Sequence, residues 1–248
     1  MHYQEKIKLL VDLVRKSGKT VVLTGAGVST ESGIPDFRSK DEGLWNKYKP
    51  EEVASIEALK RDPETFYKLN NKWWRNCLQA KPNQTHYALA QLEKMGWILG
   101  VITQNIDGLH QQAGSERVWE VHGHLRNCRC IKCQEKYEID RLQGHYRCDT
   151  CDGLLRPNVV LFGDAMSEDY FTAEKVMAGC QLLLVVGSSL QVYPVAGLPF
   201  MARQVAVINR DPTPWDGEAV VAINKVSGKV LADILELLGQ EKGPYYLG

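Results

Sequence analysis

Four of the seven cysteines are spaced as metal ligands. They form two Cys-x-x-Cys pairs, Cys130/Cys133 and Cys148/Cys151, with fourteen residues between the pairs. Two such pairs can supply four thiolates to one tetrahedral Zn²⁺, and no coordination position then stays open for a reacting water. We therefore predict a structural zinc ion that stabilises a short hairpin. Disulfides or redox pairs are the less favoured alternative, because the number of cysteines is odd.

The three remaining cysteines are not expected to bind the metal. Cys128 lies two residues before the first pair and could compete as a ligand, but Cys128-x-Cys130 does not repeat the Cys-x-x-Cys spacing. Cys77 and Cys180 stand in apolar surroundings, which favours buried small hydrophobic residues over nucleophiles.

A second group of candidate residues begins at a glycine-rich turn. The apolar run KTVVLT leads into Gly25-Ala26-Gly27-Val28-Ser29-Thr30, where small residues would let backbone N–H groups approach a pyrophosphate. Thr30 replaces the third glycine of a dehydrogenase fingerprint, and no second strand with an acidic end follows. The loop that follows carries Asp36, Phe37 and Arg38, and it is either a lid over a nucleotide or an ordinary surface loop.

Polar residues also stand at the ends of other apolar runs. In an open α/β sheet such residues converge at the carboxyl edge, where ligands bind. His122, which follows VWEV, titrates near neutral pH and suits proton transfer. His86, His110 and His124 lie in helical patterns or turns that indicate no such role. The other residues at run ends are Gln104, Asn105, Ile106, Asp107, Gly187, Ser188, Ser189 and Asn209.

These sites require an α/β fold with a mainly parallel, Rossmann-like sheet. Apolar, β-branched runs at KTVVLT, ILGVIT, VWEV, PNVVLF, QLLLVV, QVAVIN and AVVAI predict strands. Helical patterns separate many of them, at residues 3–17, 83–95, 167–179 and 227–238. Two insertions interrupt this alternation and are expected to pack together as a smaller lobe, leaving a ligand cleft between the lobes.

We predict one catalytic core over residues 1–248. Its Rossmann-like lobe comprises residues 1–37, 96–123 and 158–248, and its small lobe comprises a helical insertion at 38–95 and a zinc ribbon at 124–157.

Composition excludes several other classes of protein. Thirty Lys and Arg balance thirty Asp and Glu, so the broad positive field of a nucleic-acid or membrane-surface binder is absent. A non-enzymatic zinc ribbon that binds nucleic acid is disfavoured for the same reason. No run of eighteen apolar residues occurs. We expect a cytoplasmic protein, monomeric, without nucleic-acid or membrane partners.

The successive motifs resemble those of one known family. GAGVSTESGIPDFR, TQNIDGLHQQAG, EVHG, the four cysteines, RPNVVLFG and GSSLQVYP are similar, in this order, to the motifs of the sirtuin (Sir2-like) family of NAD-dependent protein-lysine deacylases. The resemblance extends from about residue 5 to residue 235.

The resemblance implies an NAD site and a role for each part of it. Phe37 would screen the reactive ribose from water, Ile106 and Asp107 would bind the carboxamide, and Asn105 would hold the ribose or an ordered water. Ser188, Ser189 and Asn209 would hold the adenosine half. The full implied set is Gly25, Ala26, Gly27, Thr30, Asp36, Phe37, Arg38, Gln104, Asn105, Ile106, Asp107, His122, Gly187, Ser188, Ser189, Asn209 and Val226.

The same resemblance implies the reaction. The acyl oxygen of a modified lysine attacks C1′ of the nicotinamide ribose and nicotinamide leaves, so NAD is consumed. His122 acts as general base, with Asn105 as the second catalytic residue. The 2′-oxygen then attacks the acyl carbon and water completes the reaction, so the products are free lysine, nicotinamide and 2′-O-acetyl-ADP-ribose. Mono-ADP-ribosyl transfer to protein, which would use the same NAD site, stays open as an alternative.

An acylated peptide is expected to bind as an added strand. It would lie between Val160-Leu161-Phe162-Gly163 and Leu190-Gln191-Val192, and backbone hydrogen bonds would hold it. Asp164 departs from the family pattern, because many relatives carry glutamate after the Phe-Gly pair.

The helical insertion bears on the acyl group. Relatives that prefer succinyl or malonyl lysine carry a Tyr-x-x-Arg pair there. The corresponding positions are Asn70 and Trp73 in one alignment and Tyr67 and Asn70 in the other, and neither offers a cation to a carboxylate. Arg75 is out of register. We therefore predict a preference for acetyl and other neutral acyl groups.

Overall fold

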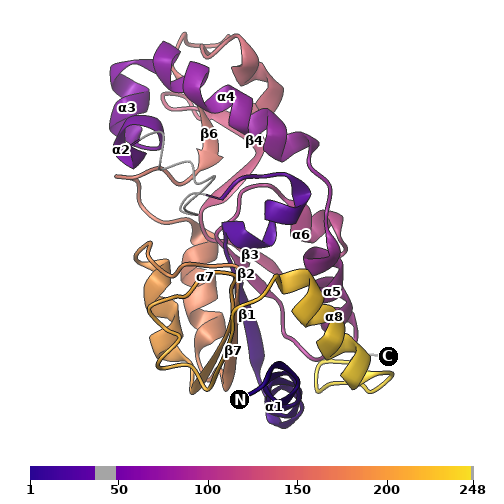
Figure 1. The fold of residues 1–248 in the computed structure, drawn as a ribbon. Helices are drawn as coiled ribbons and strands as arrows, with labels where there is room; N and C mark the ends of the chain where they lie inside the picture. Colours follow the sequence, from indigo (N-terminus) through magenta and orange to yellow (C-terminus); the bar gives the residue numbers. More distant parts are fainter. Residues whose placement is uncertain (37–48, 247–248) are drawn as a thin grey trace.

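A six-stranded parallel sheet forms the centre of the larger lobe. The computed structural model describes residues 1–36 and 49–246. The strands lie in the order β3-β2-β1-β7-β8-β9, and every neighbouring pair is parallel (Figure 1). Both central strands, β1 and β7, are buried along their whole length, as expected for apolar strands covered on both faces. Their bounds are β1 Thr20–Thr24, β2 Val101–Thr103, β3 Val118–Glu120, β7 Leu182–Val186, β8 Gln204–Ile208 and β9 Val221–Ile223.

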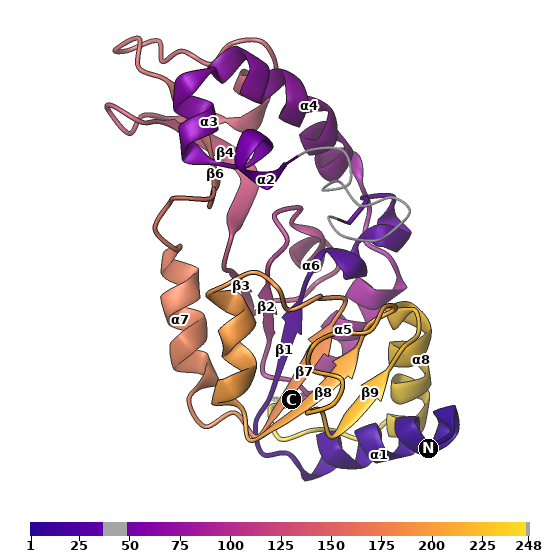
Figure 2. The same ribbon diagram turned by 60° about the vertical axis from the view of Figure 1, so that its left-hand side comes forward.

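Helices cover both faces of this sheet. On one face lie α1 (Tyr3–Lys16), α5 (Gln84–Lys94) and α8 (Ser227–Leu238), and on the other α7 (Glu168–Met177) and the 3₁₀ helix η5 (Val195–Met201) (Figure 2). Each of the four α-helices lies within a stretch whose periodicity predicts a helix. The predicted α/β fold is confirmed.

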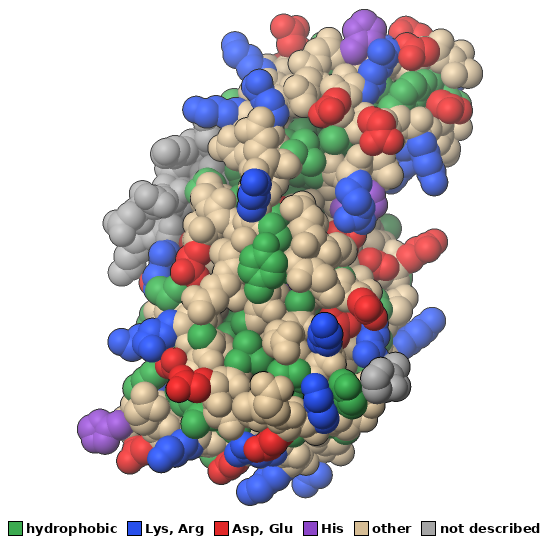
Figure 3. Space-filling view, turned by 90° about the vertical axis from the view of Figure 1, so that its right-hand side faces the viewer, with side chains coloured by type: hydrophobic (Ala, Val, Ile, Leu, Met, Phe, Trp, Pro, Cys, Tyr) green, Lys and Arg blue, Asp and Glu red, His purple; other side chains and the backbone are tan. Residues whose placement is uncertain are grey.

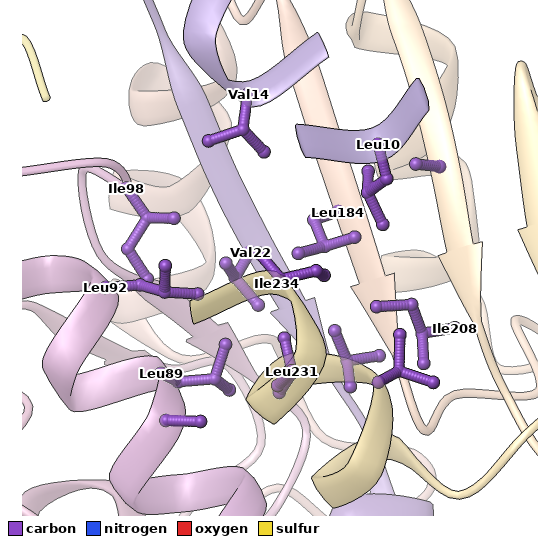
Figure 4. Packing of buried hydrophobic residues seen from close by; sticks show 14 of the residues in the cluster. Leu10, Val14, Val22, Leu89, Leu92, Ile98, Leu184, Ile208, Leu231 and Ile234 are labelled. Atoms are coloured by element: carbon purple, nitrogen blue, oxygen red, sulfur yellow. The ribbon is translucent and has the colours of Figure 1, made fainter. Parts of the chain in front are cut away.

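The first face holds one continuous apolar core. Leu89 and Leu92 of α5 and Leu231 and Ile234 of α8 meet around Val22 of β1 (Figure 4). Helix α5 therefore packs in the large lobe, although the sequence prediction assigned residues 84–95 to the small lobe. The physical reason is the apolar stripe on α5, which is buried against α8 and the sheet rather than against the other inserted helices.

In the described part of the chain, the small lobe combines α2, α3, α4 and the 3₁₀ helix η4 with an antiparallel sheet of order β5-β4-β6. Helix α4 begins at Asp62-Pro63, a pair of residues typical of a helix N-terminus: the Asp62 carboxylate accepts the Thr65 N–H at 3.1 Å, and Pro63 occupies the first turn. Its aromatic residues Phe66, Tyr67 and Trp74 form the centre of the lobe's core. The elements are α2 Pro50–Val53, α3 Ile56–Arg61, α4 Pro63–Gln79, β4 Gly123–Cys130, β5 Lys136–Glu138, η4 Ile139–Gln143 and β6 Leu155–Val159.

The run PNVVLF, predicted as a strand, contributes to the small sheet. Its first residues belong to β6, which pairs with β4. Strand β4 begins at Gly123, directly after His122, and Gly123 pairs with Val159. The chain thus passes between the lobes beside the predicted base. The short helices η1 Ala26–Val28, η2 Thr30–Ser32 and α6 Leu109–Gln112 lie at the carboxyl edge of the large sheet.

Within the described residues, no helix is long and apolar enough to cross a membrane.

Candidate active site

A cavity of about 740 Å³ lies between the lobes. The turns that follow β1, β2, β7 and β8 form its large-lobe wall, and helix α4 with residues 159–164 forms its small-lobe wall. The predicted site residues that line it are Gly25, Ala26, Gly27, Asp36, Gln104, Asn105, Ile106, Asp107, His122, Val160, Leu161, Phe162, Gly163, Gly187, Ser188, Ser189, Val192 and Asn209.

Among the described residues, Thr30, Leu190 and Val226 are not part of the cavity wall. The hydroxyl of Thr30 donates to the Gly27 carbonyl at 3.0 Å, so it shapes the turn. Phe37 and Arg38 lie outside the described residues.

Two glycine turns interlock at the carboxyl edge of the sheet. The Gly27 N–H donates to the Gly187 carbonyl at 2.8 Å. A Cβ added at Gly25 or Gly27 would meet that same oxygen at 2.9 or 2.8 Å, and Gly187 has a φ of 60°. Only glycine fits such a close approach of two backbones without a shift. The turn after β1 is therefore held against the turn after β7, with its backbone facing the cavity.

Ser29 organises the polar residues that follow β2. Its hydroxyl donates to the Asp107 carboxylate at 2.7 Å and accepts from the Asn105 amide at 3.0 Å. The Leu109 N–H donates to the other Asp107 oxygen at 3.0 Å. Burial raises the pKa of the Asp107 carboxyl, and these hydrogen bonds oppose the shift. Ser29 was missing from the predicted site. The only signal for it in the sequence is a hydroxyl within the glycine turn.

His122 is oriented for proton transfer. Its Nδ1 lies 3.1 Å from the Gln104 carbonyl oxygen. Because a carbonyl oxygen only accepts, Nδ1 carries the proton of the neutral ring and Nε2 keeps its lone pair. Burial lowers the pKa of His122, and the hydrogen bond to Gln104 partly opposes the shift. The imidazole is therefore neutral near pH 7, in the form that can accept a proton.

Backbone hydrogen bonds to Ala54, Ile56 and His122 hold the predicted peptide segment in place. The Phe162 N–H donates to the Ala54 carbonyl at 2.8 Å and the Ile56 N–H donates to the Phe162 carbonyl at 3.0 Å. The Val160 N–H donates to the His122 carbonyl at 2.8 Å. Within residues 1–36 and 49–246, no hydrogen bond engages the Val160 carbonyl or the Gly163 N–H. These two backbone groups remain for a ligand.

The cysteine quartet fits a zinc ion. The Sγ atoms of Cys130, Cys133, Cys148 and Cys151 all lie within 4.8 Å of one another, and the 130/151 and 133/148 pairs are 3.5 Å apart. A tetrahedron with Zn–S bonds of about 2.3 Å requires S–S distances of about 3.8 Å. The Tyr137 hydroxyl lies 3.2 Å from the Cys148 sulfur, as an outer partner of a metal-bound thiolate does.

The other three cysteines lie apart from this quartet. Cys128 is buried on β4, with its sulfur 3.5 Å from the Glu138 carbonyl. Cys77 and Cys180 are buried, as predicted.

Known proteins match both the sequence and this arrangement. The sequence model of the Sir2 family matches residues 25–194. The chain belongs to the Sir2 family. The family predicted from the motifs is confirmed.

Sir2 relatives match over nearly the whole chain. NAD-dependent protein deacetylase 2 of Caldanaerobacter subterraneus subsp. tengcongensis is 46% identical over 245 residues, which are 96% of this chain and 98% of that protein. NAD-dependent protein deacylase 2 of Archaeoglobus fulgidus is 42% identical over 245 residues, covering 94% of this chain and 96% of that protein.

Solved Sir2 structures share the fold. One, described as Sir2 with a p53 peptide and NAD⁺, has a TM-score of 0.86 at 38% identity, over 93% of this chain and 98% of that one. Another, with deacetylated p53 peptide and 3′-O-acetyl ADP ribose, has a TM-score of 0.90 at 38% identity, over 95% of this chain and 99% of that one. The roles of individual residues in this Sir2 chain stay predictions.

Proposed function

We propose that this Sir2 protein removes acetyl and other neutral acyl groups from protein lysines, with NAD as co-substrate. NAD-dependent protein deacetylation follows from membership of the Sir2 family. The preference for neutral acyl groups is the further step. The observation that carries the proposal is a neutral imidazole in one cavity with the glycine turn and with a backbone edge that a peptide can extend.

The large-lobe wall suits NAD. The turns at Gly25–Gly27 and Gly187–Ser189 would hold the pyrophosphate and adenosine half, and Asn209 lines the same wall. Ser29 fixes the side chains of Asn105 and Asp107 before any ligand arrives. When bound, NAD supplies an electrophilic ribose carbon and a nicotinamide leaving group.

His122 would act as the general base. Nε2 would take a proton from a ribose hydroxyl, while the Nδ1–H donates to Gln104 and stabilises the imidazolium that forms. The lowered pKa keeps the ring unprotonated at neutral pH until that step.

The peptide would add as a strand. The Val160 carbonyl suits the N–H of an acylated lysine, and the Gly163 N–H suits a carbonyl of the peptide backbone. On the opposite side, Val192 lines the cavity and Leu190 is buried, with its N–H 3.3 Å from the Ser188 hydroxyl. Because backbone groups dominate this mode of binding, sequence selectivity is modest.

The cavity wall favours uncharged acyl groups. Its described part includes no Lys or Arg. Of its aspartates, Asp164 is paired with Arg156, and Asp36 and Asp211 lie within 4 Å of Arg210, so these arginines are already engaged. Asn70 and Trp73 of α4 line the cavity, but both amide hydrogens of Asn70 are used, because Nδ2 donates to the Val53 and Phe66 carbonyls at 2.7 and 2.9 Å. A succinyl carboxylate would therefore find no cation among the described residues of the wall.

An assay over several acyl groups tests this function. Matched acetyl, propionyl, succinyl and malonyl peptides are incubated with NAD, and peptide mass and nicotinamide release are followed. We expect loss of the acetyl group with stoichiometric nicotinamide, and slower turnover of the acidic acyl groups. Faster turnover of the succinyl peptide contradicts the acyl preference. A peptide that gains an ADP-ribosyl mass and keeps its acetyl group supports mono-ADP-ribosyl transfer instead.

A cytoplasmic location and a monomeric state belong to the same proposal. Their support is the cysteine quartet, which suits metal binding in a reducing compartment, and the interspersed charges of both signs on the face shown in Figure 3.

A further inference from the structure

An ion pair between buried Arg156 and partly buried Asp164 adjoins the predicted peptide segment. The guanidinium of Arg156, on β6, donates to both carboxylate oxygens of Asp164, at 2.9 and 2.5 Å. Arg156 is only 7% exposed. Such a forked pair fixes the relative orientation of its two side chains as well as their distance.

Each member of the pair also holds the backbone. Arg156 donates to the Val159 carbonyl at 2.8 Å, and the Asp164 carboxylate accepts the Leu161 N–H at 2.8 Å. The Asp164 N–H in turn donates to the Leu161 carbonyl at 2.9 Å. The result is a closed turn over residues 161–164 with Gly163 in the left-handed region, at a φ of 89°.

The residues that flank the peptide segment, Val159 and Asp164, therefore both bind the guanidinium of Arg156. The beginning of the segment is held through Val159 and its end through Asp164, while the Val160 carbonyl and Gly163 N–H between them stay available. Neither Arg156 nor Asp164 is hydrogen-bonded, within the described chain, to the glycine turns or to residues 104–107 of the NAD wall.

We propose that the Arg156–Asp164 ion pair positions the peptide-binding segment Val160–Gly163, so that it sets affinity for the acylated peptide without setting affinity for NAD. The inference rests on the proposed function. Arg156 and Asp164 are positioning residues, because they act through the backbone of the segment rather than on the reacting atoms.

The test compares Asp164→Asn and Asp164→Glu with a matched control. Asparagine removes the charge and leaves the buried guanidinium without its counter-ion, whereas glutamate restores the charge with one extra methylene. The control is Glu241→Gln, which alters another forked pair, with Arg15, at 2.9 and 2.7 Å on the surface of the large lobe. All variants are assayed for the KM of acetyl peptide and of NAD, for zinc content and for thermal unfolding.

We expect Asp164→Asn to raise the peptide KM about tenfold, with kcat and the KM of NAD within about twofold of the parent values. Asp164→Glu should recover most of the peptide affinity, and Glu241→Gln should change neither KM. An unchanged peptide KM in a destabilised Asp164→Asn protein would show a purely structural pair and overturn the inference. A parallel rise in both KM values would overturn it as well.

Direct binding separates this inference from the proposed function. Affinity for the acetyl peptide is measured by calorimetry without NAD, in the parent protein and in Asp164→Asn. If the parent binds peptide but shows no turnover, the proposed function fails while weaker binding by the variant still supports the positioning role. If the parent binds no peptide, or both proteins bind it equally, the positioning role is refuted.

Discussion

At the scale of single residues, the site depends on which nitrogen of His122 carries a proton. The Gln104 carbonyl determines this, because it accepts the Nδ1–H at 3.1 Å and leaves Nε2 as the basic atom. Both residues lie at the carboxyl ends of neighbouring parallel strands, because Gln104 follows β2 and His122 follows β3. The arrangement is therefore a property of the sheet and exists before any ligand binds.

Replacing His122 by alanine should lower kcat for deacetylation by about 10²–10⁴-fold, the usual contribution of a general base. The fold should be kept, because the ring lines a cavity rather than filling the core. Steady-state kinetics and circular dichroism check both statements. His124→Gln is the matched control and should retain activity within about twofold. Full activity in His122→Ala would remove this residue from the base role.

At the scale of elements, one face of α4 forms the end wall of the cavity. Leu69, Asn70, Trp73, Trp74 and Cys77 follow helical spacing and all line it. Packing of Phe66 and Tyr67 into the lobe core anchors the helix. Trp74 and Cys77 also belong to the lobe core, so only a change at the partly buried Asn70 or Trp73 can alter the ligand without unpacking the lobe.

Trp73→Arg should make the enzyme more tolerant of acidic acyl groups. The substitution places one cation in a wall whose described part has none. We expect the ratio of kcat/KM for succinyl over acetyl peptide to rise about tenfold, as for one charge-assisted contact. The outward-facing Arg75 provides the control, since Arg75→Ala should leave the ratio unchanged. A ratio that stays constant in Trp73→Arg would indicate that the acyl group binds away from this helix face.

Removal of the metal should disturb the position of the predicted base His122, because one strand connects the two sites. Strand β4 begins just after His122 and ends at Cys130. Cys148→Ala should lose zinc, expose the small lobe to protease and reduce deacetylation by more than about tenfold. Cys180→Ala, which removes a buried thiol of the large lobe, should keep the metal. Zinc content by mass spectrometry and limited proteolysis measure the effect, and a zinc-free Cys148→Ala protein with normal activity would contradict it.

At the scale of the whole molecule, two buried histidines bear on acid stability. His86 of α5 and His110 of α6 contact each other with ring centroids 4.9 Å apart. His110 is hydrogen-bonded to Thr24 at 3.0 Å, at the end of β1. Burial lowers the pKa of His86 to about 4 and lowers the pKa of His110 as well. Both rings are therefore neutral inside the folded large lobe.

Stability should fall as the pH falls from about 7 to about 5. The unfolded chain, with ordinary histidine pKa values near 6.5, binds more protons in this range than the folded chain does, so the free energy of unfolding rises with pH. His86 alone should contribute about 2 kcal/mol to this loss. Urea unfolding at both pH values measures it, and His86→Gln should lessen the slope. Equal stability at both values would refute the expectation.

Much of this architecture could be predicted from the sequence, because the relevant signals are local. Apolar runs and helical periodicity indicated the parallel strands and α1, α5, α7 and α8, and Asp62-Pro63 indicated the start of α4. Contacts between distant segments could not be predicted in the same way. Ser29 meets Asp107, and Phe162 pairs with Ala54 and Ile56, only because the fold brings separate parts of the chain together.

The interlocked glycine turns limit which residues of the cavity wall can be substituted in related enzymes. Gly25, Gly27 and Gly187 form the wall that we propose binds NAD, and there any added side chain meets another backbone. The opposite wall is made of side chains on α4 and of a segment fixed by one ion pair. Evolution should therefore vary the acyl and peptide range of such enzymes far more freely than their use of NAD.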